Sequence, residues 1–244
     1  MILLCPSALL AMADGPAPIL GPVNPATLFG ASEKGTYYNF TNGASLAVNA
    51  DGTGGTPAVG AACSSVLDLS PNGNRLRNTV GSVTRRANGV ETSGAGYGLF
   101  NMAGFGDWPA FGAPYEIMIC FEQMAYGSTY ARIIGSGGGP WGLLQSTASG
   151  QIAWFDSTLE ADVAMPIGQE SVFHVATISG GCFYALDGGT PVTFGGAGTG
   201  LDGIVLGSGS GGGNNVQMRV KHLLVIGRAL TAGERSGVVQ WMQA

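Results

Sequence analysis

Three carboxylates lie close together in the second half of the chain, at Asp156, Glu160 and Asp162. A predicted strand ends at this point, so all three are expected in one loop. Carboxylate oxygens are the ligands that Ca²⁺ prefers, and this spacing could hold the ion. An acidic loop facing solvent explains the same pattern and is the interpretation we favour. We therefore predict no cofactor, with calcium as the alternative.

Aromatic residues in glycine-rich segments form a second group that could do chemistry. Trp108, Trp141 and Tyr126 lie among glycines, where surface loops are expected. An exposed aromatic ring offers an apolar face on which the C–H surface of a sugar packs. These three are the predicted glycan-binding residues, whereas Trp154 and Trp241 are expected in the core.

Catalytic groups are not brought together by the sequence pattern. His174 and His222 are the only histidines, and each falls in a predicted apolar strand, where a core histidine with satisfied hydrogen bonds is expected. The sequence contains neither Gly-x-Ser-x-Gly nor Cys-x-x-Cys, the patterns of many serine hydrolases and metal sites. The glycines at 207, 209 and 212 match a dinucleotide pattern, but a strand rather than a helix follows them. We predict that the chain is not an enzyme.

Composition and charge argue against two kinds of partner. The net charge is −5, with only 10 lysines and arginines, which suits neither DNA nor RNA phosphates. Apolar runs stay well short of the roughly 20 residues of a membrane helix. Charged residues make up 10% of the chain, against roughly 25% in an average soluble protein. This favours, about equally, a neutral stable domain and a surface covered in an assembly of its own copies and other proteins.

The second half of the chain reads as short strands between glycine turns. Tyr115, Ile117, Ile119 and Phe121 alternate with Glu116, Met118, Cys120 and Glu122, which is the period of a strand. Further strands are expected at 131–134, 142–145, 151–155, 172–178, 182–186, 192–194, 203–206 and 216–226. This pattern predicts an all-β, antiparallel sandwich or jelly roll. Cys120 and Cys182 are expected as buried thiols, with a disulfide between them as the alternative.

The last predicted strand leads into a predicted helix. Alternation places Val216, Met218, Val220, His222, Leu224 and Ile226 on one face of this strand. Thr231 and Glu234 then form a capping box, in which each side chain binds the backbone N–H of the other residue. A short C-terminal helix should follow and pack on the sheet through Val238, Val239, Trp241 and Met242.

The N-terminal segment differs from the rest. Five of the 12 prolines lie within residues 1–26, and proline favours extended chain. We expect an extended arm at 1–26, with a short helix at about 25–34, and then one domain at 27–244. Within that domain, 27–110 is irregular and 111–244 holds the clearest core. We also expect an intact N-terminus, with a cleaved signal peptide as the alternative.

Several strand motifs resemble those of laminin-G-like domains. Phe173–Thr177 and Cys182–Gly188 look like the paired strands of that family, the second ending in aspartate-glycine. Gly203–Gly207 resembles the next strand, and Arg228–Thr231 with Glu234 is similar to the closing turn. The likeness covers about the last 70 residues and implies a concanavalin/laminin-G-like sandwich. Arg219 to His222 stand where the family's penultimate strand carries an acid, which weakens any acidic role there.

The first part of the chain looks like the leader of laminin-G-like proteins of tailed bacteriophages. The likeness rests on Thr27–Phe29, Glu33–Tyr38 and Asp68–Asn74. It implies a virion structural protein, such as a capsid decoration, head-fibre or tail-fibre component, forming homo-oligomers and able to bind cell-surface polysaccharide. The alternatives are a secreted or virion glycan-binding adhesin and a glycoside hydrolase of concanavalin-like fold.

The hydrolase alternative is tested by a carboxylate motif. Hydrolases of this type carry Glu-x-Asp-x-x-Glu, because two carboxylates must flank the scissile bond. The nearest match begins at Glu160 and Asp162, but Met165 stands where the third acid is needed. The motif therefore disfavours a glycosidase.

Overall fold

A computed structural model describes the chain from residue 21 onwards, apart from 79–80, 97, 103–111, 137–140, 147–148, 157, 161, 179–181, 196–199 and 209–213. Most of the predicted arm at 1–26 and the predicted sugar platform Trp108 lie outside the described residues. In the described part, no helix is long and apolar enough to cross a membrane.

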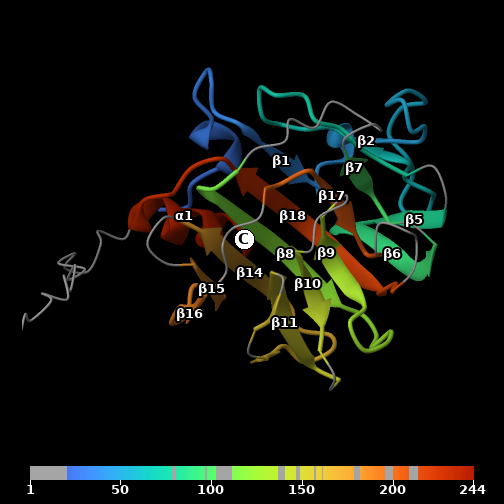
Figure 1. The fold of residues 1–244 in the computed structure, drawn as a ribbon. Helices are drawn as coiled ribbons and strands as arrows, with labels where there is room; N and C mark the ends of the chain where they lie inside the picture. Colours follow the sequence, from blue (N-terminus) through green and yellow to red (C-terminus); the bar gives the residue numbers. More distant parts are fainter. Residues whose placement is uncertain are drawn as a thin grey trace, which may run out of the picture.

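The described strands form two antiparallel sheets (Figure 1). Sheet A runs in the order β16-β15-β14-β8-β18-β6-β5, and β1 also pairs with β18. Its strands are β1 (Gly35–Asn39), β5 (Gly81–Arg86), β6 (Gly89–Gly96), β8 (Tyr115–Gln123), β14 (Glu170–Thr177), β15 (Cys182–Leu186), β16 (Val192–Phe194) and β18 (Met218–Ile226).

Sheet B runs in the order β12-β11-β10-β9-β17-β7-β4-β3-β2, and β13 pairs with β11. Its strands are β2 (Leu46–Ala47), β3 (Ser65–Val66), β4 (Leu76–Arg77), β7 (Phe100–Met102), β9 (Arg132–Gly135), β10 (Trp141–Gln145), β11 (Gln151–Asp156), β12 (Thr158–Leu159), β13 (Val163–Ala164) and β17 (Gly203–Leu206). Two 3-10 helices, η1 (Pro25–Leu28) and η2 (Gly43–Ser45), and one α-helix, α1 (Ala232–Met242), complete the described elements. The prediction of an all-β antiparallel fold with a short C-terminal helix is confirmed.

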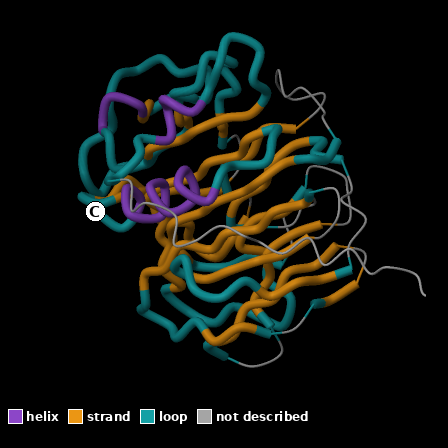
Figure 2. Tube along the Cα trace, turned by 90° about the vertical axis from the view of Figure 1, so that its left-hand side faces the viewer, coloured by secondary structure: helices purple, strands orange, loops and turns teal. Residues whose placement is uncertain are grey.

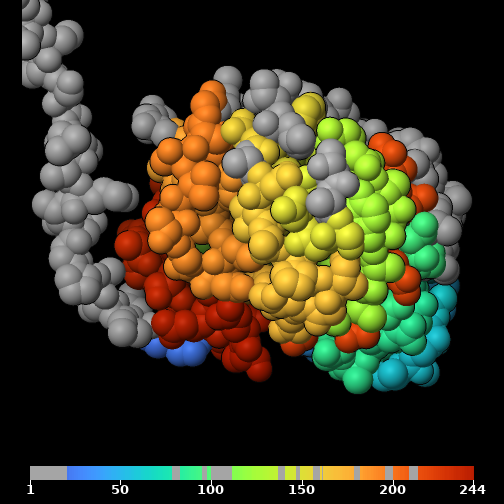
Figure 3. All heavy atoms as spheres, turned by 90° about the horizontal axis from the view of Figure 1, so that it is seen from below, coloured from blue at the N-terminus to red at the C-terminus, as the bar shows by residue number. Residues whose placement is uncertain are grey.

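The two sheets share one hydrophobic core. Ile117 and Ile119 of β8 belong to the same buried cluster as Leu143 of β10 and Trp154 of β11. Within it, the rings of Trp154 and Phe173 stack with centroids 6.2 Å apart, which joins sheet B to sheet A. Strand alternation places these residues on the facing sides of the two sheets. Seen from below, the segments from about 120 to 200 make up much of the surface (Figure 3).

The outer face of sheet A is covered by α1, which lies against the strands (Figure 2). Met118 and Cys120 of β8 pack there against Val238, Val239 and Met242 of the helix. The predicted capping box begins this helix: the Glu234 N–H donates to Thr231 Oγ1 at 3.2 Å, and the Thr231 N–H donates to Glu234 Oε2 at 2.7 Å. The predicted docking of the C-terminal helix is therefore confirmed.

The end of the predicted arm also packs on α1. The Val23 N–H donates to the Gly237 carbonyl at 2.9 Å, and Val23, Leu28 and Phe29 pack on the cluster beneath the helix. The helix expected over about 25–34 was predicted too long, because only η1 forms and Phe29 is already extended. The apolar contacts of Leu28 and Phe29 explain this early end.

A β-bulge in β18 corrects the predicted face of that strand. Val220 pairs with Phe121 and His222 pairs with the preceding Cys120, so Lys221 is an extra residue. Such an insertion turns every following side chain to the opposite face. Val216, Met218 and Val220 accordingly lie in the core between the sheets. Leu224 and Ile226 lie under α1 instead.

Candidate glycan-binding site

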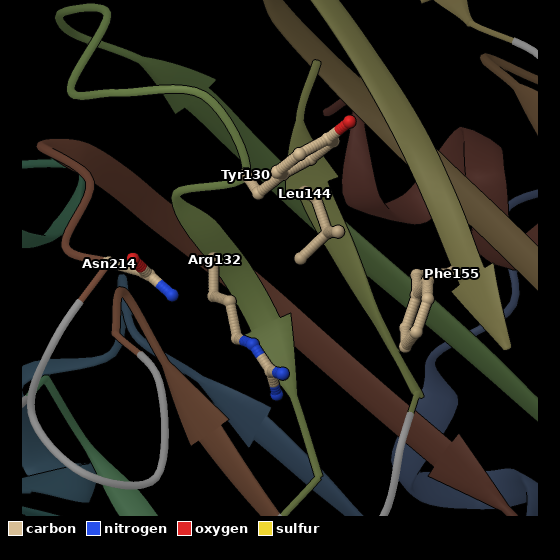
Figure 4. Close-up of a pocket in the computed structure, with 5 residues that line it drawn as sticks. All are labelled: Tyr130, Arg132, Leu144, Phe155 and Asn214. Carbon is tan, nitrogen blue, oxygen red and sulfur yellow. The ribbon is translucent and has the colours of Figure 1, made fainter. Parts of the chain in front are cut away.

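A pocket of about 300 Å³ lies beside strands β9, β10 and β11 of sheet B. It is lined by Tyr130, Arg132, Leu144, Phe155 and Asn214 (Figure 4). In Figure 4 the Arg132 side chain runs along β9, Phe155 stands across the pocket from it, and Leu144 lies between them. The pocket thus combines an aromatic and an aliphatic wall with polar groups.

Strand register explains why these side chains share the outer face of sheet B. Leu143 pairs with Trp154, and both point into the core. Their neighbours Leu144 and Phe155 therefore point outwards. A register shift next to Leu144 places it opposite Arg132, whose side chain joins them outside.

Two glycines leave the outer face of sheet B without side chains next to these pocket residues. Gly135 pairs with Gly142, which pairs with Phe155 on its other side. A Cβ added at Gly135 would lie 3.1 Å from Arg132 Nη1. The missing side chain therefore leaves room for the guanidinium to lie along β9.

The rim of the pocket carries unusual backbone geometry. Tyr130 has φ of 63° and Asn214 has φ of 53°, a region that non-glycine residues rarely occupy. Both are held by backbone hydrogen bonds: the Tyr130 N–H donates to the Gln145 carbonyl at 2.9 Å, and the Arg132 N–H donates to the Asn214 carbonyl at 2.8 Å. Strained residues fixed in this way gather at ligand sites.

The guanidinium of Arg132 carries the pocket's charge. Burial lowers its pKa, but an arginine still holds its proton at neutral pH. Among the described residues, no carboxylate lies within ion-pair distance of it. The pocket therefore presents a partly buried positive charge beside apolar surface.

The predicted sugar platforms do not coincide with this pocket. Trp141 is fully buried and stacks on Trp154 with ring centroids 5.8 Å apart, so the prediction of an exposed platform there is wrong. Trp141 was misplaced because its glycine-rich surroundings conceal the start of an inward-facing strand. Tyr126 is partly buried, and its hydroxyl donates to the Ser146 carbonyl at 3.1 Å. A sugar contact by Tyr126 stays a prediction.

Sequence reasoning missed the residues that line the pocket. Tyr130, Arg132, Leu144 and Asn214 carried no motif, and Phe155 read as an ordinary strand residue. One signal was present: Arg132 is a charged residue within the apolar run from 131 to 134. A charge in such a strand marks the side that does not face the core.

The acidic loop is described in part. The Ser146 hydroxyl donates to Asp162 Oδ1, whose side chain is exposed. No group of three or more His, Cys, Asp or Glu side chains able to hold a metal occurs among the residues that the structure describes. The side chain of Asp156 lies outside that description, so calcium binding by Asp156, Glu160 and Asp162 stays a prediction.

The two histidines are structural, as predicted. His174 is buried and lies 2.7 Å from the carboxylate of Glu116. His222 is buried with its Nδ1 3.1 Å from the Tyr37 hydroxyl. Cys120 and Cys182 are both thiols rather than a disulfide pair.

No protein-family model and no curated protein matches the chain. Among solved structures, it is similar to the Trypanosoma rangeli sialidase in complex with sialic acid, at 14% identity and a TM-score of 0.62, over 91% of this chain and 36% of the sialidase. It is also similar to a GH54 α-L-arabinofuranosidase soaked with a cyclic sulfate inhibitor, at 16% identity and a TM-score of 0.54, over 90% of this chain and 65% of that chain. The chain thus spans about a third of the sialidase, and at these identities the likeness shows a shared fold.

These similarities correct the functional predictions made from sequence. The sialidase and the arabinofuranosidase that share this fold are glycoside hydrolases rather than virion or tail-fibre components. The prediction of a bacteriophage virion structural protein is overturned by this finding, and so is the prediction that the chain is not an enzyme. The glycoside hydrolase alternative, disfavoured because of Met165, agrees better with the fold.

Proposed function

We propose that the chain is a concanavalin/laminin-G-like β-sandwich domain of a glycoside hydrolase, and that it holds a glycan in the pocket on sheet B. The fold shared with two glycosidases supports the enzyme class. The main support for glycan binding is the pocket, because it brings Phe155, Tyr130 and Leu144 next to Arg132 and Asn214.

The chemistry of the lining fits a sugar. The ring of Phe155 and the side chain of Leu144 offer apolar surface for the C–H faces of a pyranose. The guanidinium of Arg132 and the amide of Asn214 offer hydrogen bonds to its oxygens. Tyr130, 44% exposed, adds a second ring at the rim. A volume of about 300 Å³ suits one or two sugar units, at the lower end of the range for ligand sites.

The pocket's role in this proposal is recognition of the glycan. Hydrolysis needs two carboxylates that flank the scissile bond, and the pocket-lining residues in the described ranges include no carboxylate. We therefore assign bond cleavage to another part of the enzyme. Association of the chain with its own copies, expected from its charge-poor surface, remains a separate proposal.

The test is a glycan screen with the 244-residue chain, read by direct binding and by mass spectrometry for cleavage products. Phe155→Ala should weaken binding about tenfold, since it removes an aromatic wall. Val192→Ala, at an exposed residue of β16, is the control and should bind as the unmodified chain does. The proposal fails if the chain binds no glycan, or if Phe155→Ala leaves every affinity unchanged.

A further inference from the structure

The geometry points to an anionic sugar as the occupant of this pocket: we propose that Arg132 binds a carboxylate or sulfate group carried by the sugar ring. This inference rests on the proposed function and narrows it to one class of ligand. Its first support is that the pocket places an unpaired arginine beside apolar side chains.

Arginines with buried or half-buried side chains differ in their partners, and several pair with carboxylates. Arg219 lies 3.1 Å from Glu122, and Arg235 lies 2.6 Å from Glu116. Arg86 and Arg228 are also ion-paired. Arg75 and Arg85 donate to backbone carbonyls instead. Among the described residues, Arg132 shares with Arg77 a partly buried side chain that has neither an ion pair nor a side-chain hydrogen bond, and Arg132 lines the pocket. Because the unpaired Arg132 lines a pocket, we expect its partner to come from a ligand.

A charged partner would satisfy the Arg132 guanidinium better than a neutral one. A guanidinium removed from water loses hydration, and a neutral hydroxyl replaces only part of it. A carboxylate or sulfate compensates for the lost hydration through charge-assisted hydrogen bonds, which are about twice as strong as neutral ones. The rigid fork of arginine also matches two oxygens of one oxyanion.

The site is built to present this charge. Gly135 leaves space for the Arg132 side chain, which would meet a Cβ there at 3.1 Å from Nη1 and 3.2 Å from Cδ. The backbone of Asn214 holds the strand at Arg132 through a 2.8 Å hydrogen bond. Phe155 stands across the pocket from the guanidinium (Figure 4). A sugar ring packed on Phe155 and Leu144 would thus direct a charged substituent towards Arg132.

The experiment compares matched pairs of sugars by calorimetry with the complete chain. The carboxylate pairs are sialyllactose against lactose, and a galacturonate oligomer against its methyl ester. The sulfate pair is sulfated galactose against galactose. We expect the anionic member of at least one pair to bind roughly ten- to a hundredfold more tightly, with a preference that falls as salt is added.

Two arginine variants locate the effect. Arg132→Gln should abolish the preference for the anionic sugar, while Arg132→Lys, which keeps the charge but loses the fork, should retain part of it. Arg86→Gln removes an arginine from sheet A that is paired with Glu91 and should keep the full preference. Thermal unfolding of each variant shows that the domain remains folded.

Each outcome either supports or overturns the assignment of an anionic sugar to the pocket. A preference in the carboxylate pairs assigns a sugar acid, and one in the sulfate pair assigns a sulfated sugar. Equal binding of anionic and neutral members, or a preference that survives both Arg132 substitutions, overturns the inference and leaves the proposed function standing. Absence of binding by every sugar in both experiments overturns the proposed function as well.

Discussion

The carboxylate of Glu116 on β8 accepts a hydrogen bond from the Arg235 guanidinium on α1 at 2.6 Å, with the Glu116 side chain fully buried. His174 lies 2.7 Å from the same carboxylate, and the Leu230 N–H donates to it at 2.7 Å. Burial alone would raise the pKa of Glu116, but the hydrogen bonds from His174 and Arg235 outweigh it and hold that pKa below its usual value. The cluster therefore fastens the C-terminal helix to sheet A.

Arg235→Ala should destabilise the domain strongly. It leaves the buried Glu116 carboxylate without its guanidinium partner, and breaking a buried pair in this way costs about 3–5 kcal/mol of unfolding free energy. Urea unfolding measures the change. Ser236→Ala, on the exposed side of the same helix, is the control and should stay close to the unmodified chain. A loss below about 1 kcal/mol for Arg235→Ala would mean that the pair does not fasten the helix.

Stability should fall with acid through His222. Burial, together with the neighbouring Lys221 charge, lowers the pKa of His222 from 6.5 to about 4. Its Nδ1 faces the Tyr37 hydroxyl, which receives a hydrogen bond from Trp241 Nε1 at 3.2 Å and can therefore donate to neutral His222. Because the unfolded chain binds the proton more readily, His222 contributes stability above about pH 6.5 that is lost as the pH falls towards 4.

The size of this effect follows from the shift, which corresponds to about 3 kcal/mol between pH 6.5 and 4. His222→Gln removes the titrating group, so its stability should vary much less across this range. Denaturant unfolding at a series of pH values gives the comparison, with Ser236→Ala expected to keep the full dependence. Equal slopes for His222→Gln and the unmodified chain would assign the acid sensitivity to other groups.

The fold class followed from sequence because its signals are local. Alternation from Tyr115 to Phe121 and the Thr231–Glu234 capping box depend on neighbours a few residues apart, and both appear as predicted. The bulge at Lys221 has no such local signal. It lies in the pairing of β18 with β8, two strands far apart in the sequence, so alternation along one strand cannot reveal it.

The pocket escaped prediction for a related reason. Arg132, Leu144 and Phe155 come from three neighbouring strands, and their meeting depends on the register shift between β9 and β10. The prediction that Trp141 is exposed was wrong for a different reason. Its glycine-rich setting indicates a loop, but the residue lies in a strand of sheet B and is buried in the core. Sequence alone also could not place Glu116 inside, since its partner Arg235 lies 119 residues away.

A substitution at Gly35 should expose the close packing of β1 on β18. Gly35 has φ of 140°, and a Cβ there would lie 2.2 Å from the Val225 carbonyl oxygen. Gly35→Ala should therefore cost about 1–3 kcal/mol of unfolding free energy through strain and crowding. Gly30→Ala, with open space around the added Cβ, is the matched control and should leave the thermal midpoint unchanged. Similar midpoints for both variants would contradict the close approach.

The Asp68 carboxylate organises the turn from 68 to 74. It accepts from the backbone N–H groups of Tyr37 at 2.9 Å, Ser70 at 2.8 Å and Asn74 at 2.9 Å. Asp68→Asn replaces an acceptor oxygen by an NH₂ group facing one of these donors. We expect a loss of about 1–3 kcal/mol by urea unfolding. Asp51→Asn, in an exposed loop, should stay near the unmodified chain; a loss no larger at Asp68 would deny its organising role.

Gly135→Ala should separate ligand binding from folding. The added methyl group would approach the Nη1 and Cδ atoms of Arg132 to 3.1 and 3.2 Å. Because these atoms belong to a flexible side chain, the guanidinium should move while the strand keeps its pairing with Gly142. We expect an unchanged thermal midpoint and a loss of up to about tenfold in affinity for the preferred anionic sugar. Gly30→Ala serves again as the control. Retained affinity in Gly135→Ala would show that the position of the guanidinium along β9 is not what selects the ligand.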